Sequence, residues 1–440
     1  MTTQLDISTI TRLARQPGLA GDTLAQLREA GMKAFIQRGL PAAHDEEWRF
    51  TNTDPLAEIA WQLTTDLLDA KEAYDASTLH TVAAAELVFV NGKLSPSLTR
   101  RDALPQGVYV GLLADAPADV AALAMSKLAS TVGVDKSPFA ALNAGFLDQV
   151  AIVHVARGVV VQKPISILNL AATATSPLLF CPRVLVIAEA GANFRLAQSD
   201  AGETAQAVLS NTVTELFVGR DAVVEHYQTN WLSQSAWAFG NTLATLAEGA
   251  HYTHHSVTFG GKLSRNDLEV VLDGQHADAT LNGLVLVDGD RQTDNHTLIR
   301  HEKANCGSHE LYKHVVDEKA FGVFKGKIFV QKDAQKTDAR QTNRTLLLSD
   351  RARMESMPAL EIYADDVKCS HGSTTGPLDE DMLFYLRSRG LTTQEARSLL
   401  IYAFAADMTA RIKVPLIRRK IETFLAAKQD LPQDLSIEAM

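Results

Sequence analysis

The chain has few cysteines, and none of them forms a paired motif. Its three cysteines, Cys181, Cys306 and Cys369, are widely separated in 440 residues. An odd number of scattered thiols is typical of a reducing compartment rather than of a disulfide-stabilised secreted protein. Because no CxxC pair occurs, the chain alone offers no local four-thiolate metal site. We expect Cys181 and Cys306 to be buried as small apolar side chains.

Positive charge and long apolar runs are also scarce. The formal net charge is −10 and the pI is near 5.7, which argues against a broad surface for nucleic acid or anionic lipid. No run of about 18 apolar residues is present, so we expect no membrane span. The N-terminus has no apolar stretch of signal-peptide length, and we therefore expect a cytoplasmic protein.

The motifs of several common enzyme classes are missing. The segment Gly322–Lys327 reads GVFKGK, with three residues between its glycines and Ile328 after the lysine, whereas a nucleotide-binding P-loop needs four residues and then Ser or Thr. No GxGxxG opens a helix after a strand, and no GxSxG or HExxH occurs. We expect no nucleotide bound by this chain and no enzymatic centre of these classes.

Helical periodicity is confined to the two ends of the chain. In the N-terminal part it predicts helices over Asp22–Arg38, with Asp22 as N-cap, over Glu58–Lys71 and over Ala118–Ser130. In the C-terminal part it predicts one helix from Asp379 to Gly390 and a second over Thr392–Met408, where Thr392 and Glu395 form a capping box. The chain thus has helical regions on both sides of a long central stretch.

The central stretch is β-rich and repetitive. Glu86–Lys93 reads as a strand that ends in an Asn-Gly turn, and from Val150 to Pro377 short β-branched runs replace helical periodicity. A turn-like unit recurs there at a nearly regular interval, at Ala192, Ala222, Ala250, Gln275, Ala304, Ala334 and Val367. A repeat with a period of about 30 residues that contains only short strands is typical of a β-solenoid rather than of a sandwich.

Cys369 and His371 stand out in the last repeat. Residues i and i+2 of a strand point to the same side, so the two present a thiol and an imidazole together, among small neighbours that leave room for a ligand or another chain. Such groups are soft metal ligands, although packing would explain the pair equally well. Ten of the 13 histidines lie between His226 and His371, which fits either a metal-handling face or the polar exterior of a solenoid.

Several blocks of the sequence resemble the SufB/SufD family of iron–sulfur cluster assembly scaffolds. The segment ADDVKCSHGSTTGPLDEDMLFYLRSRGL, with Cys369 and His371, is similar to the C-terminal signature on the SufD side of that family, and LPAAHDEEWRFTN is similar to its N-terminal motif. Phe50 in that motif stands where the family more often has Tyr. Further similar blocks follow in the same order as in the family: PFAALNAGF, GVVVQKPI, FKGKIFV and QKTDARQTNRTLLLS.

Pattern and resemblance together define the expected architecture. The resemblance implies a right-handed parallel β-helix between helical terminal regions. We expect a mainly helical region over 1–148, the β-helix over 149–375 and a C-terminal helical domain over 376–440. The sequence assigns no role to His254, His255 or Cys306 beyond a polar or buried position.

The resemblance also implies partners and site residues. It implies a non-catalytic scaffold that acts with a SufB-like subunit and the ATPase SufC, and it leaves open whether the isolated chain forms a homodimer. His371 matches a family histidine that helps to hold a transient iron–sulfur cluster shared with SufB, and Cys369 matches a cysteine near that interface. The residues that match the SufC-docking region are Leu383, Phe384, Tyr385, Leu386, Arg387, Arg389 and Gly390.

Two other functions stay open at this point. A β-solenoid could act as a polysaccharide lyase or hydrolase if an acidic or arginine-lined groove ran along its side. It could also be a purely structural homo-oligomer that associates through its coil edges. The number of irons in a cluster and the binding of a flavin or other reductant are not readable from the sequence.

Overall fold

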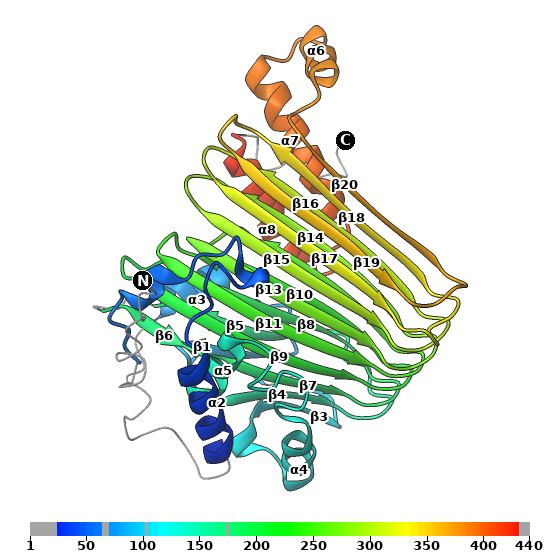
Figure 1. The fold of residues 1–440 in the computed structure, drawn as a ribbon. Helices are drawn as coiled ribbons and strands as arrows, with labels where there is room; N and C mark the ends of the chain where they lie inside the picture. The colour runs from blue at the N-terminus through cyan, green and yellow to red at the C-terminus, as the bar shows by residue number, and fades with distance from the viewer. Residues whose placement is uncertain (1–23, 64–69, 102–103, 173–175, 431–440) are drawn as a thin grey trace.

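The fold is a flattened parallel β-helix in which two large sheets face each other, with helices at both ends of the chain (Figure 1). The computed structural model describes residues 24–63, 70–101, 104–172 and 176–430. The predicted β-solenoid flanked by helical regions is confirmed. None of the helices within these ranges is long and apolar enough to cross a membrane.

The first sheet contains, in spatial order, β2 (Lys93–Leu94), β1 (Ala85–Val90), β5 (Ile165–Leu170), β8 (Asn193–Gly202), β10 (Val223–Leu232), β12 (His251–Thr258), β14 (Asp278–Val287), β16 (Gly307–Val316), β18 (Asp338–Leu347) and β20 (Lys368–Gly376). The second sheet contains β19 (Arg353–Ile362), β17 (Phe321–Val330), β15 (Gln292–His301), β13 (Leu263–Leu272), β11 (Ala236–Leu246), β9 (Val208–Val218), β7 (Arg183–Ala188), β4 (Val150–Val155) and β3 (Val108–Leu112), and β6 (Leu178–Phe180) pairs with β9. The pairs β1–β2 and β3–β4 are antiparallel.

The sequence repeat corresponds to one coil of the helix, because each repeat supplies one strand to each sheet. Every predicted unit falls just before a strand of the first sheet, from β8 at Ala192 to β20 at Val367. The small residue at this corner is buried in successive coils, as Ala192, Ala222, Ala250 and then Cys306 show. A small side chain is needed there because the chain turns against the coil below. Cys306 is therefore a structural residue of the core, as expected.

The N-terminal region contributes helices and strands. Its helices are α2 (Ala25–Arg38), α3 (Lys71–Ser77), α4 (Ala118–Lys127) and α5 (Pro138–Gly145), with short 3₁₀ turns at Glu46–Trp48, Asp54–Ala57 and Leu113–Asp115. Strands β1 to β3 also precede residue 149 and belong to the two sheets.

Two helix predictions in this region need comment. The helix predicted over Asp22–Arg38 is α2, although Asp22 lies outside the described residues. The prediction over Glu58–Lys71 is wrong for residues 58–63, which are not helical, and residues 64–69 lie outside the described part. There Trp61 is buried and donates its indole N–H to the Leu56 carbonyl, and Gln62 bridges to β6. Packing overrides local periodicity at this point.

The segment Leu40–Asn52, which carries the N-terminal motif, docks on the outer face of the second sheet. Trp48 is buried, as predicted for a core anchor, and the Arg265 guanidinium lies 3.8 Å from its ring centroid. Arg265 contacts Asp294, with 3.2 Å between Nη1 and Oδ2. His296 lies 2.9 Å from Asp294 Oδ1 and 3.6 Å from Glu47 Oε2. A cluster of buried charges thus joins the segment to β13 and β15.

The C-terminal helices are α6 (Glu380–Ser388), α7 (Thr393–Thr409) and α8 (Pro415–Lys428). The Thr392–Glu395 capping box forms as predicted at the start of α7. Helices α7 and α8 pack on the outer face of the first sheet, where apolar residues such as Tyr402 and Ile421 meet Tyr227 and Val257. Helix α6 projects beyond the last coil (Figure 1).

Candidate functional site at the open end of the β-helix

The last coil of the β-helix ends in two edge strands. β20 pairs with β18 on one side and β19 pairs with β17, and among the described residues no strand covers the other edge of either. Side chains that would be buried in an inner coil are half-buried or exposed in these two strands. Unpaired backbone N–H and C=O groups on such an edge are available to another chain.

Cys369 and His371 lie on this edge, on the side of β20 that faces the inside of the coil. In the register with β18, Cys369 is opposite the buried Ala339 and His371 is opposite the buried Gln341. The two side chains therefore share one side of the strand, as the i, i+2 spacing requires. Cys369 is half-buried and His371 is exposed, and burial raises the pKa of the Cys369 thiol.

The space beside this pair is open. His371 is exposed, and a Cβ built on Gly372, on the opposite side of the strand, would meet no atom within 4 Å, so no other part of the described chain covers either side of β20 at this point. The half-buried Met354 and Leu360 lie on β19, the last strand of the opposite sheet. The end face therefore combines an accessible imidazole, a thiol and apolar side chains.

A column of polar side chains leads from His371 into the core. Successive coils place His371, Gln341 and Glu310 at the same register position. Gln341 Nε2 donates to Glu310 Oε2 at 2.6 Å, while Gln341 Oε1 and Glu310 Oε1 have no partner in the described part of the chain. Burial raises the pKa of Glu310 to about 7, against the hydrogen bond from Gln341, which lowers it.

Sequence reasoning missed Gln341 and Glu310. The signal that could have found them is the phase of the repeat, which places residue 310 in line with 341 and 371 once the strands are registered. In an isolated strand, Glu310 simply looks like a solvent-exposed carboxylate. Its position inside the coil becomes visible only when the neighbouring coils are paired.

Half of the ten histidines between His226 and His371 lie inside the solenoid rather than on its exterior. Among those that the sequence singled out, five are almost completely buried: His226, His254, His255, His301 and His314. His226 is held by Tyr252 and Gln198, at 3.0 and 3.2 Å from its two ring nitrogens. Burial lowers the pKa of His226 to about 3 and that of His314 to about 4. Burial also lowers the pKa values of His254 and His301, so these four imidazoles are neutral polar groups of the interior, whereas His255 lies 3.4 Å from Glu225 Oε1.

A complete metal site is not formed by this chain in its described part. No group of three or more His, Cys, Asp and Glu side chains there could hold a metal ion. Cys369 and His371 together supply two ligands, whereas protein-bound iron–sulfur clusters take about four. A cluster at this edge would therefore need ligands from a second chain.

The segment GVFKGK also lacks the structure of a nucleotide site. Gly322–Lys327 lies inside β17, where Lys325 pairs with Glu47, at 2.8 Å between Nζ and Oε1, and Lys327 pairs with Glu361. A P-loop needs a turn that leads into a helix. The sequence-based exclusion of a P-loop here agrees with this extended conformation.

Helix α6 displays a second accessible surface next to the open end. Asp379 caps it by accepting hydrogen bonds from the backbone N–H groups of Asp381 and Met382. Of the residues predicted to dock a partner, Leu383 is buried and Leu386 is half-buried. Exposed side chains are Met382 (56%), Phe384 (72%), Tyr385 (56%), Arg387 and Arg389, while Gly390, with φ of +99°, ends the turn.

Comparison with known proteins places this arrangement in a family. Residues 170–404 match the model described as "SUF system FeS cluster assembly, SufBD core domain", and residues 19–167 match the SufBD N-terminal region. The chain is 29% identical over 438 residues to an iron–sulfur cluster assembly SufBD family protein of Synechocystis, covering 96% of this chain and 95% of that protein.

Two further relatives carry the name SufD. The Escherichia coli iron–sulfur cluster assembly protein SufD is 28% identical over 398 residues, 89% of each chain. The Bacillus subtilis SufD is 27% identical over 305 residues, 68% of each chain. The matched core contains Cys369, His371 and helix α6. The chain therefore belongs to the SufBD family and is a SufD-like component of iron–sulfur cluster assembly.

Proposed function

We propose that this chain is a non-catalytic scaffold subunit that acts with a SufB-like subunit and a SufC-like ATPase. It would present His371, with Cys369 beside it, to a nascent iron–sulfur cluster at the interface with the SufB-like subunit. The observation that supports this most directly is the inward-facing pair on an uncovered edge strand. The cluster is the cargo of the assembly, and this chain supplies part of its environment.

The chemistry of the edge fits a shared site. An exposed imidazole can bind iron without first breaking a protein contact, whereas the buried histidines of the interior are held by Tyr, Gln and Asn side chains. A thiol whose pKa is raised by burial is mostly protonated until a metal lowers that pKa. We therefore assign ligation first to His371 and a supporting role to Cys369.

Helix α6 would carry the contact with the ATPase. Phe384 and Tyr385 expose more than half of their surface, and an exposed aromatic pair on a projecting helix is typical of a protein interaction surface. Because α6 follows β20 after a short connection, movement of a docked ATPase would be transmitted directly to the strand with His371. ATP hydrolysis would belong to the partner.

Co-purification and cluster reconstitution test the proposal. The chain is co-expressed with the SufB-like and SufC-like proteins of its own organism, and the purified complex is incubated with iron and sulfide. We expect a complex of all three proteins whose visible absorption shows a cluster. His371→Ala should leave the complex assembled and lower the cluster yield at least fivefold, because an imidazole ligand is lost.

The matched control is His309→Ala. His309 is exposed on β16 in the same sheet but lies outside the end strand, so its loss should leave the cluster yield unchanged. Equal yields from wild type and His371→Ala would refute the role of His371. Isolation of the chain only as a homo-oligomer, without either partner, would instead support a purely structural protein.

A further inference from the structure

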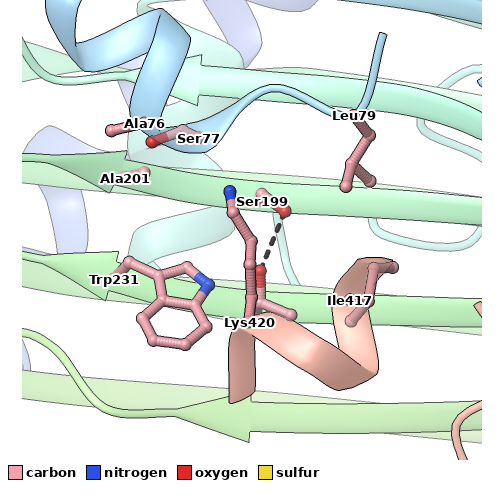
Figure 2. Close-up of a pocket in the computed structure, with 9 residues that line it drawn as sticks. Ala76, Ser77, Leu79, Ser199, Ala201, Trp231, Ile417 and Lys420 are labelled. Atoms are coloured by element: carbon pink, nitrogen blue, oxygen red, sulfur yellow. Dashed lines mark hydrogen bonds between the residues drawn. The ribbon is translucent and has the colours of Figure 1, made fainter. Parts of the chain in front are cut away.

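A small pocket lies on the outer face of the first sheet, far from the open end. It is bounded by the C-terminal end of α3, by strands β8 and β10, and by helix α8 (Figure 2). Its volume is about 190 Å³. Both apolar and polar side chains line it, among them Leu79, Ser199, Thr229, Trp231, Ile417 and Lys420.

Lys420 is the one charged side chain among the described residues that line this pocket. Figure 2 shows it extending from α8 toward β8, with the Trp231 ring beside it. It is half-buried, and no carboxylate of the described chain lies within 4.0 Å of its Nζ. On the same helix, by contrast, Arg418 pairs with Glu422, at 2.8 Å between Nε and Oε1, and Lys428 pairs with Asp288.

The environment of Lys420 favours an added anion. Burial lowers the pKa of its ammonium group, and the more distant Glu86 offsets this only in part. Glu86 itself is committed elsewhere, because it accepts hydrogen bonds from the Leu79 backbone N–H at 2.8 Å and from Ser166 Oγ at 2.9 Å. A partly desolvated cation without a counter-charge costs free energy, and an anionic ligand would recover it.

The pocket also holds an unused hydrogen-bond donor. Ser199 Oγ and Thr229 Oγ1 are 2.8 Å apart, so one hydroxyl donates to the other. Each hydroxyl has one proton, and neither makes another hydrogen bond within the described chain. One O–H therefore remains free beside Lys420. Thr229 is 5% exposed and lines the pocket, so a ligand would meet its hydroxyl from inside the pocket.

The remaining walls are apolar and one of them is aromatic. Trp231 is fixed by edge-on contacts with Phe259 and Phe424, at centroid distances of 4.9 and 5.4 Å, while Leu79 and Ile417 close the opposite side. A dry apolar cavity of about 150 Å³ accommodates benzene in another protein. A volume of about 190 Å³ therefore fits one ring with a small substituent.

We propose that this pocket binds a small aromatic monocarboxylate, with its ring against Trp231 and its carboxylate on Lys420 and the free hydroxyl of the Ser199–Thr229 pair. A neutral ligand would leave the ammonium uncompensated, and a protonated benzylic amine would be repelled by it. An aliphatic carboxylate would leave the apolar walls unfilled. This site is independent of the cluster-assembly role proposed for the open end of the β-helix.

Benzoate is the probe, and the full chain is labelled with 5-fluorotryptophan. The Trp231 resonance is assigned from the Trp231→Phe variant, and its ¹⁹F shift is followed during titration. We expect saturable binding of benzoate, and at least tenfold weaker binding of benzyl alcohol, benzylamine and acetate. Lys420→Met should weaken benzoate binding at least tenfold, while Lys420→Arg should retain most of it.

Arg419→Met is the matched control, because Arg419 is the exposed neighbour of Lys420 on the same helix; it should leave benzoate binding unchanged. Should Lys420→Met not fold, Thr229→Val provides a second test, since loss of the hydroxyl should also weaken binding. Absence of a benzoate-dependent shift, equal binding by Lys420→Met or Thr229→Val, or equal affinity for benzyl alcohol would each overturn the proposal.

Discussion

The charge cluster under the N-terminal motif makes stability depend on pH through His296. Burial disfavours its charged form, but the ion-pair contacts with the carboxylates of Asp294 and Glu47 outweigh burial and raise the pKa of His296 from 6.5 to about 9. At 1.36 kcal/mol for each pH unit, this difference corresponds to about 3 kcal/mol of folding free energy. His296 is 13% exposed, so solvent screening reduces this figure little.

The direction of this pH dependence follows from the difference in proton binding between the folded and the unfolded chain. Between pH 6.5 and 9 the folded chain binds a proton at His296 that the unfolded chain has released, so stability falls as pH rises through this window. The contribution is fully present below pH 6.5 and is lost above about 9. Glu47 affects stability in an acidic pH range. Its contact with His296 lowers its pKa to about 2, so its contribution to stability is present above pH 4.5 and is lost as pH falls toward 2.

The test is urea unfolding of wild type and His296→Gln between pH 6 and 9.5, followed by fluorescence and circular dichroism, whose transitions must coincide for two-state treatment. We expect the variant to be destabilised at pH 6, and the difference to shrink by about 3 kcal/mol at pH 9.5. His251→Gln, at an exposed histidine on β12, is the control. A difference between wild type and His296→Gln that stays constant across this range would refute the reasoning.

Three further outcomes follow from the structure. Arg183→Met should lower the free energy of unfolding by about 3–5 kcal/mol in urea, because it leaves Glu215 charged and fully buried without the guanidinium that now lies 2.7 Å from it; an unchanged midpoint would contradict this. Glu310→Gln should gain stability relative to wild type as pH rises from 4.5 to above 7, since the raised pKa means that the folded chain must release a buried proton there; parallel pH curves would count against it. Phe384→Glu should weaken capture of the SufC-like ATPase at least tenfold in a pull-down, whereas Ile36→Glu, at an exposed apolar residue of α2, should not; retained capture would exclude α6 as the docking helix.

The His371 edge and the α6 surface are close together in the chain. β20 ends at Gly376 and α6 begins at Glu380, so the ATPase proposed to dock on α6 would lie one short connection from the histidine proposed as a cluster ligand. Behind His371, Gln341 on β18 is held by its hydrogen bond to Glu310 on β16. Displacement of β20 would break its parallel pairing with β18.

The local signals of the sequence were sufficient to predict the repeat, the capping residues and the position of Cys369 and His371 on one side of a strand. These properties depend on side-chain spacing along a single segment, and the period of the repeat sets the length of one coil. The motif comparisons were equally local. They indicated the SufBD family because its blocks are contiguous and occur in order.

Only the tertiary structure decided which polar groups lie inside the coil. The burial of Glu310, Gln341 and His254 follows from the register between strands of successive coils. The same holds for Lys420, which α8 places in the pocket over β8 and β10, with no carboxylate of the described residues within 4.0 Å of its Nζ. Spacing along the chain determines which side of a strand a residue occupies, whereas contacts between coils determine what surrounds it.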